Sequence, residues 1–425
     1  MNYHLETLPN KIRVLFVPMP SLESATVTVW VKTGSRNETD DIAGISHFLE
    51  HIVFKGSKKR PSAREISESI DAIGGEFNAS TSKEWTNFHI KARKESLDTV
   101  FDVLSDMVLN PILSEKEIER EKGVIIEEIA MYEDTPIYQI GEVFERSLYK
   151  GNNLGRDVIG FEKSVKNIKK DDFILYRKRY YYPENILISV SGGVDKKEVV
   201  ALVKKYFGSL KASKVQKESI ESFKSNQSKP QVILVGKKNE QAHLMLGFLG
   251  NKRDSKDKYV EAVTSSILGG GMSSRMFTEV REKRGLAYAV RVSSDHYKDT
   301  GEILTYVGVD PKNSEKVIKV ILDEYYALSE KKKKITTKEL LKAKEYLKGQ
   351  LALSLEDTVS VNDFFGIKAL FGLDLKTPDE VFKGIDKVTE NEIYEYAKRV
   401  FIPEKLNLAV IGPFTEKSLF EKALK

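Results

Sequence analysis

A polar stretch near the middle of the chain is the feature that most constrains its fold. Residues Leu210–Pro230 (LKASKVQKESIESFKSNQSKP) are rich in lysine and serine and carry few apolar side chains. This composition is typical of a linker between domains. The flanking stretches are of comparable length, and 425 residues are too many for one ordinary hydrophobic core. We therefore predict an N-terminal domain over residues 1–210, a linker over 211–229 and a C-terminal domain over 230–425.

The two predicted domains repeat the same order of elements. Ala25–Lys32 in the first and His243–Leu249 in the second are β-prone apolar stretches, and each is followed by a polar loop and a helical pattern. Further strand-like runs are Phe77–Ile90, Ile186–Val190, Ala287–Ser293, Glu302–Val309 and Leu406–Ile411. We expect an α+β protein with two homologous halves, each an antiparallel sheet flanked by helices.

Composition removes several classes of function. The chain has no cysteine, so disulfides, thiolate nucleophiles and thiolate metal ligands are excluded. The net charge of +5 is a small excess among 68 basic and 63 acidic residues and gives no reason to expect nucleic-acid binding. No apolar run approaches the ~18 residues of a membrane helix, and the N-terminus lacks a secretory signal pattern. We expect a cytoplasmic protein that binds neither membrane nor nucleic acid, although a leader removed earlier would not be visible.

Two of the six histidines lie four residues apart, at His47 and His51. The surrounding pattern predicts a helix over Ile42–Lys55, with Asp41 as its N-cap and Gly56 just beyond its end. Residues at i and i+4 share a helix face, so the two imidazoles can bind one metal ion.

Glu50 lies beside the second histidine, which completes the order H-x-x-E-H. A carboxylate at this position can approach a water on the metal without being a ligand, and the order is a metallopeptidase signature. Taken alone, the motif is equally compatible with an exposed polar helix face.

A catalytic zinc ion needs a third protein ligand. The best candidates lie on a second predicted helix, Glu115–Glu133, which begins with a capping box of Ser114 and Glu117. On it, Glu121 and Glu128 are two turns apart and share a face. One could bind the metal and the other could orient a ligand, and the spacing does not say which.

The segment Gly74–Ser80 follows a predicted helix whose capping box is Ser62 with Glu65. Two glycines end that helix and a strand follows at once. An open strand edge here could pair with a substrate backbone through main-chain hydrogen bonds. The alternative is a purely structural hairpin with Trp85–Ile90.

Four motifs together carry a resemblance to a known family. The sequences HFLEH, GGEFNAST, EREKGVIIEE and REKRGLAY occur in this order. The chain resembles the pitrilysin/insulysin superfamily of inverted-motif zinc peptidases over nearly its whole length. It is most similar to the short processing-peptidase branch, which includes the β subunit of mitochondrial processing peptidase and bacterial relatives.

The resemblance implies a Zn²⁺ site in the first half. His47, His51 and Glu128 match the three zinc ligands of the family. Glu50 matches the general base, and Glu121 matches a glutamate on the same helix that supports the site. The second half has no H-x-x-E-H motif.

The resemblance also implies how substrate is held. Asn78 and Ala79, with Phe77 beside them, match the edge strand that pairs with the substrate backbone. Arg281 and Tyr288 match a pair that binds substrate and stabilises the transition state.

The function implied is zinc-dependent endopeptidase activity on peptides or unfolded segments. Large relatives hold four homologous halves in one chain and this chain holds two, so the resemblance implies a dimer in which Arg281 and Tyr288 serve the partner's zinc. A homodimer is the economical interpretation, and a heterodimer with a non-catalytic homologue is the alternative. The competing functional class is a non-catalytic structural subunit of a processing-peptidase-like complex.

Overall fold

The structure is a computed structural model that describes residues 1–212 and 220–424. Part of the predicted linker 211–229, namely residues 213–219, lies outside the described residues. The described chain forms two compact units. The first contains Met1–Ala130, Arg156–Ile220 and Leu353–Thr377, and the second contains Met131–Gly155, Glu221–Ala352 and Pro378–Lys425. Met131–Gly155, from the N-terminal half of the sequence, therefore belongs to the second unit, and Leu353–Thr377, from the C-terminal half, belongs to the first. The predicted domains were two consecutive stretches of chain.

The first unit is built on a six-stranded sheet in the order β1-β2-β6-β3-β5-β4. Its strands are β1 His4–Thr7, β2 Arg13–Pro18, β3 Ser24–Val31, β4 Glu76–Thr81, β5 Thr86–Arg93 and β6 Ile186–Gly192. Only the pair β2–β6 is parallel, and the other pairs are antiparallel. The predicted strand Phe77–Ile90 is thus the hairpin β4–β5.

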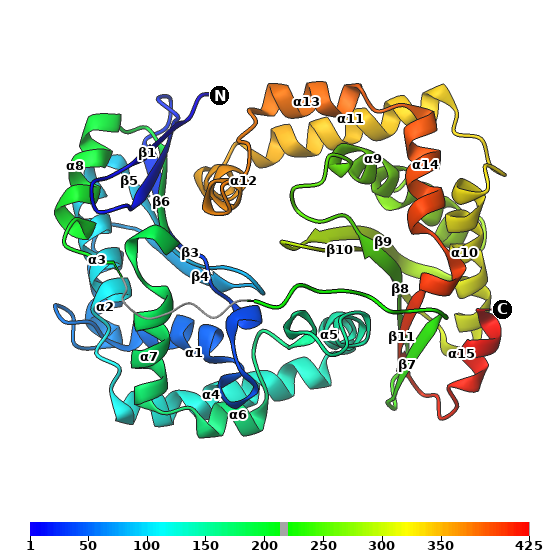
Figure 1. Ribbon diagram of the computed structural model, residues 1–425, viewed down its shortest axis with the longest axis horizontal. Helices are drawn as coiled ribbons and strands as arrows, with labels where there is room; N and C mark the ends of the chain where they lie inside the picture. Colours follow the sequence, from blue (N-terminus) through cyan, green and yellow to red (C-terminus); the bar gives the residue numbers. More distant parts are fainter. Residues whose placement is uncertain (213–219, 425) are drawn as a thin grey trace. The chain divides into compact units, whose positions relative to one another are not determined.

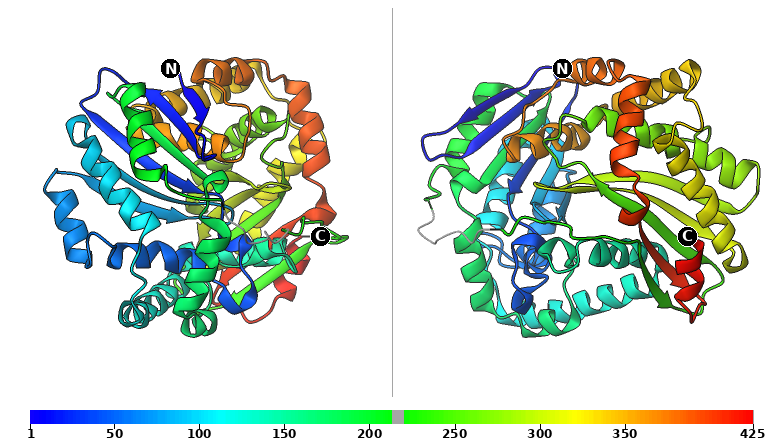
Figure 2. Two further views of the ribbon diagram at one scale, coloured as in Figure 1. Left: turned by 60° about the vertical axis from the view of Figure 1, so that its left-hand side comes forward. Right: turned by 45° about the vertical axis from the view of Figure 1, so that its right-hand side comes forward.

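Helices cover both faces of this sheet, as Figures 1 and 2 show. The helices α3 (Leu97–Leu109) and α8 (Lys196–Phe207) lie on one face, and α12 (Thr358–Leu370) lies on the other. On α12, Asn362 donates hydrogen bonds to the backbone oxygen of Thr26 and the hydroxyl of Thr28 on β3. Seven of the eight residues of β3 are buried, which explains why its sequence is β-prone throughout and carries no charged residue.

The second unit repeats this sheet with five strands in the order β7-β11-β8-β10-β9. They are β7 Gln231–Gly236, β8 Ala242–Gly250, β9 Ala287–His296, β10 Gly301–Val309 and β11 Asn407–Gly412. Again one pair, β7–β11, is parallel. The expectation of two homologous α+β halves is confirmed, with the addition that each antiparallel sheet contains one parallel pair.

Two apolar clusters lie on the two faces of the second sheet. On β8, Leu244, Leu246 and Phe248 belong to the cluster formed with helices α9 (Lys258–Gly269), α10 (Ser314–Ser329) and α14 (Glu390–Val400). Met245, which alternates with them, belongs to the cluster of α5 (Pro136–Leu148), where Phe144 is fully buried. Each sheet is therefore covered on one face by a helix from the other half of the sequence, α12 on the first and α5 on the second.

The remaining α-helices complete the two units. They are α1 Ile45–Ile52, α2 Ala63–Asp71, α4 Glu115–Asp134, α6 Glu162–Asn167, α7 Lys170–Tyr180, α11 Thr337–Ser354, α13 Pro378–Asp386 and α15 Ser418–Ala423. The predicted cap of α2 is confirmed, since the Ser62 hydroxyl accepts a hydrogen bond from the Glu65 amide. Over the described ranges, every helix is too short or too polar to cross a lipid bilayer.

Candidate metal centre

The helix that carries the histidine motif is shorter than predicted. The sequence indicated Ile42–Lys55 with Asp41 as the N-cap, but α1 begins after Gly44, whose φ of 93° is left-handed and suits glycine. The cap comes instead from the buried carboxylate of Glu38, which accepts hydrogen bonds from the amides of Gly44 at 2.7 Å and Ser46 at 2.8 Å. Burial raises the pKa of Glu38 to about 7.

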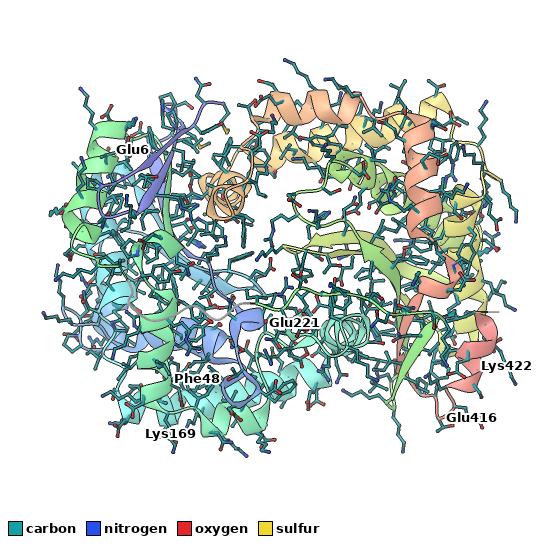
Figure 3. The ribbon with its side chains drawn as sticks, in the orientation of Figure 1. Glu6, Phe48, Lys169, Glu221, Glu416 and Lys422 are labelled. Atoms are coloured by element: carbon teal, nitrogen blue, oxygen red, sulfur yellow. The ribbon has the colours of Figure 1, made fainter. Side chains whose placement is uncertain are left out.

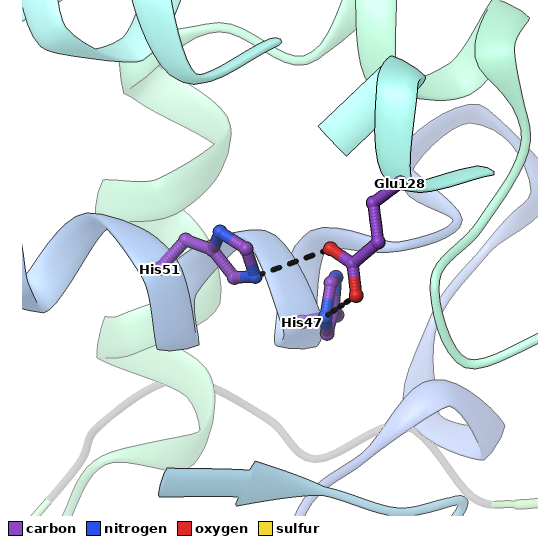
Figure 4. A group of neighbouring side chains, drawn as sticks. All are labelled: His47, His51 and Glu128. Atoms are coloured by element: carbon purple, nitrogen blue, oxygen red, sulfur yellow. Dashed lines mark ion pairs between the residues drawn. The ribbon is translucent and has the colours of Figure 1, made fainter. Parts of the chain in front are cut away.

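Packing of the apolar face of α1 determines where the histidines on its other face point. Phe48, labelled in Figure 3, is fully buried and meets Phe173 of α7 edge to face, with ring centroids 5.0 Å apart. Leu49 and Ile52 are buried as well. His47 and His51 lie on the remaining face and turn their rings towards α4 (Figure 4).

Three side chains converge on one point between α1 and α4. The Nε2 atom of His47 lies 3.8 Å from one carboxylate oxygen of Glu128, and Nε2 of His51 lies 3.5 Å from the other. One donor atom from each of the three lies within 4.8 Å of the others. In the part of the chain that the structure describes, this is the one group of histidine and acidic side chains arranged to hold a metal ion.

The electrostatics of the group suit a cation. Burial, with a smaller contribution from His51, lowers the pKa of His47 to about 3, so its imidazole is neutral at physiological pH. Burial also raises the pKa of Glu128. A neutral imidazole offers a lone pair, and the half-buried carboxylate of Glu128 gains from a positive charge placed beside it. Two imidazoles and one carboxylate form a donor set that zinc accepts, with a fourth position left for water.

A fourth side chain orients the second histidine. Glu121 is buried, and its carboxylate lies 3.0 Å from Nδ1 of His51 and 2.8 Å from the ammonium group of Lys55. A proton on Nδ1 shared with Glu121 leaves Nε2 unprotonated and directed at the metal position. Of the two glutamates that the spacing left open, Glu128 therefore lies among the candidate ligands and Glu121 lies behind one of them. The contribution of Lys55 was not foreseen, because nothing in the motif spacing indicates it.

Glu50 lies beside this group and is held by β4. Burial raises the pKa of its carboxyl, while a 2.5 Å hydrogen bond from the Thr81 hydroxyl acts in the opposite direction. Sequence reasoning missed Thr81, although it ends the motif GGEFNAST. Thr81 reaches Glu50 because β4 packs beside α1 in the folded protein.

The predicted substrate segment lies on β4, which is an edge strand of its sheet. Phe77 packs against Phe54, with ring centroids 5.4 Å apart, and Ala79 is buried. The amide of Ala79 donates to the side-chain oxygen of Asn78 at 2.9 Å. Both interpretations of the segment are compatible with this arrangement, because β4 forms a hairpin with β5 and also exposes one edge.

The predicted Arg–Tyr pair lies in the second unit. Arg281 lies in the last turn of a π-helical segment, Phe277–Glu282, and donates a hydrogen bond to the backbone oxygen of Tyr288 at 2.9 Å. Its guanidinium carbon lies 4.4 Å from the centroid of the Tyr288 ring, which is 80% exposed. The metal group belongs to the first unit, so the structure brings Arg281 and Tyr288 together but places them in a different unit from the metal group.

Comparisons with known proteins find relatives over nearly the whole chain. A family profile described as "Insulinase (Peptidase family M16)" matches residues 13–161, and one described as "Peptidase M16 inactive domain" matches residues 167–347. An uncharacterized zinc protease of Streptomyces coelicolor is 35% identical over 415 residues, which are 97% of this chain and 90% of the relative. The uncharacterized zinc protease YmxG of Bacillus subtilis is 37% identical over 407 residues, covering 96% of this chain and 97% of the relative.

A solved structure agrees over the same extent. The crystal structure of a protease from Helicobacter pylori superimposes with a TM-score of 0.90 at 26% identity, covering 97% of this chain and all of that one.

Proposed function

Because the chain belongs to the insulinase family of peptidases, family M16, we propose that it is a zinc-dependent endopeptidase that uses Glu50 as its general base. The observation that supports this most strongly is the convergence of His47, His51 and Glu128 on one point, with the Glu50 carboxylate beside it. Zinc fits the centre by its donor set, and several relatives are named zinc proteases.

Each residue of the centre has a separate task in peptide-bond hydrolysis. His47, His51 and Glu128 would hold the zinc, which when bound supplies a Lewis acid that acidifies water and polarises the scissile carbonyl. Glu50 would take the proton of the attacking water and deliver it to the leaving amine. The Thr81 hydroxyl holds one oxygen of Glu50 and leaves the other available for that proton.

Substrate would bind as an added strand on β4. Its backbone would pair with the edge that carries Asn78 and Ala79, and the paired aromatic rings of Phe54 and Phe77 offer an apolar surface next to it. Main-chain pairing tolerates varied side chains, which favours peptides and unfolded segments as substrates. For this pairing, Asn78 would have to release the Ala79 amide that it now holds.

A Glu50→Gln variant tests the assignment of the base. We expect it to bind one zinc ion as the wild type does and to lose peptide hydrolysis by about 10²–10⁴-fold, the usual contribution of a general base. Zinc content is measured by metal analysis, and cleavage of an unfolded peptide by mass spectrometry with and without a chelator.

Glu127→Gln is the matched control, because this exposed glutamate lies on the same helix next to Glu128. Wild-type protein with neither bound zinc nor chelator-sensitive cleavage would contradict the proposed activity and favour a non-catalytic subunit.

A further inference from the structure

The two sheets correspond strand by strand, with one exception. If β2, β6, β3, β5 and β4 are matched with β7, β11, β8, β10 and β9, the order of the second sheet repeats that of the first. The parallel pair falls at the same place in both. The strand without a counterpart is β1, which covers the outer edge of β2 in the first sheet. Within the described residues, the outer edge of β7 is uncovered.

The register shows which part of β7 lacks a partner. Pairing of β2 with β6 begins at Arg13 and ends at Pro18, and pairing of β7 with β11 begins at Gln231 and ends at Gly236. The residues Arg13–Phe16, which pair with β1, therefore correspond to 231–234 of β7.

The backbone groups on this outer edge pair with no other strand in residues 1–212 and 220–424. The amides of Gln231 and Lys237 donate to the backbone oxygens of Leu406 and Gly412, on the side of β11. Backbone amides point alternately to the two sides of a strand. The amides of Val232 and Leu234 therefore point away from β11, to the outer side, where a further strand could pair with them.

A groove of about 700 Å³ lies along this edge. Val232 and Ile233 of β7 contribute to it, the C-terminal turn of α5 contributes Arg146, and α15 with the residue before it contributes Glu421 and Lys417. Val232 faces the cluster on the α15 side of the sheet and Ile233 faces the cluster on the α5 side. Figure 3 labels Lys422 on α15 and Glu416 just before it. The groove thus has a strand edge between two helices, with a volume in the range of ligand sites.

The charges that line the groove are mainly positive. The basic lining residues are Arg146, Lys150, Lys229 and Lys417, and the one acidic lining residue is Glu421. Glu421 pairs with Lys417 at 3.3 Å, and Arg146 pairs with Glu142 at 3.6 Å, which leaves Lys150 and Lys229 as the uncompensated charges. Lys150 and Lys229 are exposed, and neither has an acidic partner within 4.0 Å among the described residues. Two ammonium groups at an open strand edge favour a ligand that brings carboxylates.

We propose that β7 accepts an extended acidic segment of a partner protein, which occupies the position that β1 holds in the first sheet. Its backbone pairs with the outer edge of Val232 and Leu234, and its carboxylates meet Lys150 and Lys229. None of the residues that line the groove belongs to the metal centre, so we infer a segment that is bound and not cleaved. This inference is independent of the peptidase activity.

The test uses the full chain and a short capped peptide that alternates glutamate and valine, labelled for fluorescence anisotropy. We expect saturable binding that weakens with added salt. The double variant Lys150→Glu/Lys229→Glu should bind the peptide roughly tenfold more weakly, since two attractive charge pairs become repulsive. The control variant Lys256→Glu/Lys338→Glu makes the same charge change at two exposed lysines outside the groove and should bind as the wild type does.

A second peptide separates strand addition from simple charge attraction. The same sequence with every backbone amide N-methylated keeps every carboxylate but cannot pair along either edge, and we expect it to lose binding. Equal binding of the methylated peptide, or unchanged binding by the Lys150/Lys229 variant, would overturn the proposal. Cleavage of the peptide at a rate that falls in that variant would also overturn it, because the groove would then serve substrate and not a partner.

Discussion

At the scale of single residues, the centre depends on side chains that would never touch the substrate. Glu121 accepts from His51 and pairs with Lys55, so it fixes both the proton on Nδ1 and the orientation of the ring. We expect Glu121→Gln to weaken zinc binding by about 10–100-fold, the usual effect of losing such a partner. Competition with a chromophoric chelator measures the affinity. Glu127→Gln, on the exposed side of α4, should leave it unchanged.

Thr81 offers a second prediction at this scale, in the pH dependence of activity. Its hydroxyl stabilises the charged form of Glu50, so it lowers the pKa of a carboxyl that burial raises. A base works when deprotonated. Loss of the hydroxyl in Thr81→Val should therefore raise the pKa and move the acidic limb of the kcat/KM profile to higher pH, by about one unit for a hydrogen bond to a charged group.

Thr81→Ser retains the hydroxyl and should keep the wild-type profile. An identical acidic limb in Thr81→Val would show that the hydrogen bond does not tune Glu50.

At the scale of elements, α1 is held at its start by a carboxyl group buried in the folded protein. The pKa of Glu38 is raised to about 7, so between the ordinary value near 4.5 and that value the folded state binds a proton that the unfolded state does not. Its contribution to stability is therefore greatest below about pH 4.5 and is lost as the pH rises towards 7.

We expect the free energy of unfolding of the wild type to fall across this window by up to about 3 kcal/mol relative to Glu38→Gln, which cannot titrate. Urea denaturation at several pH values gives the difference. Parallel curves for the two proteins would contradict the raised pKa.

The same helix shows how far local sequence rules reach. Asp41 has the right side chain for a cap, but Gly44 starts α1 and the capping oxygens come from Glu38. Spacing placed Glu121 and Glu128 on one face, yet only the packing of α4 on α1 distinguishes them. Periodicity located most of the strands, because it depends on neighbouring residues, but the sequence analysis missed β1, β2 and β7. It could not indicate the parallel pairs, or the contact of Thr81 with Glu50, which depend on the order of strands in the sheet.

At the scale of the whole molecule, Arg281 and Tyr288 belong to a different unit from the metal group. The family resemblance of the sequence predicts that they act on the zinc of a second chain. Mixing Arg281→Ala with Glu50→Gln tests this directly. If two chains form a symmetric dimer, half of the random dimers are mixed and each has one intact site, so we expect roughly a quarter of the wild-type activity.

Each parent alone should be nearly inactive. No recovery after subunit exchange has been confirmed by mass spectrometry would show that each chain uses its own Arg–Tyr pair.

The exchange of α5 and α12 between the two sheets has a consequence for synthesis on the ribosome. The Thr26 hydroxyl bonds to that of Thr358, a partner 332 positions later, so the first sheet emerges long before the helix that covers one of its faces. During that interval the indole of Trp30 and the alternating threonines of β3 lack their final cover. The nascent chain is then exposed to aggregation, and chaperones that shield apolar surface should matter most in that interval.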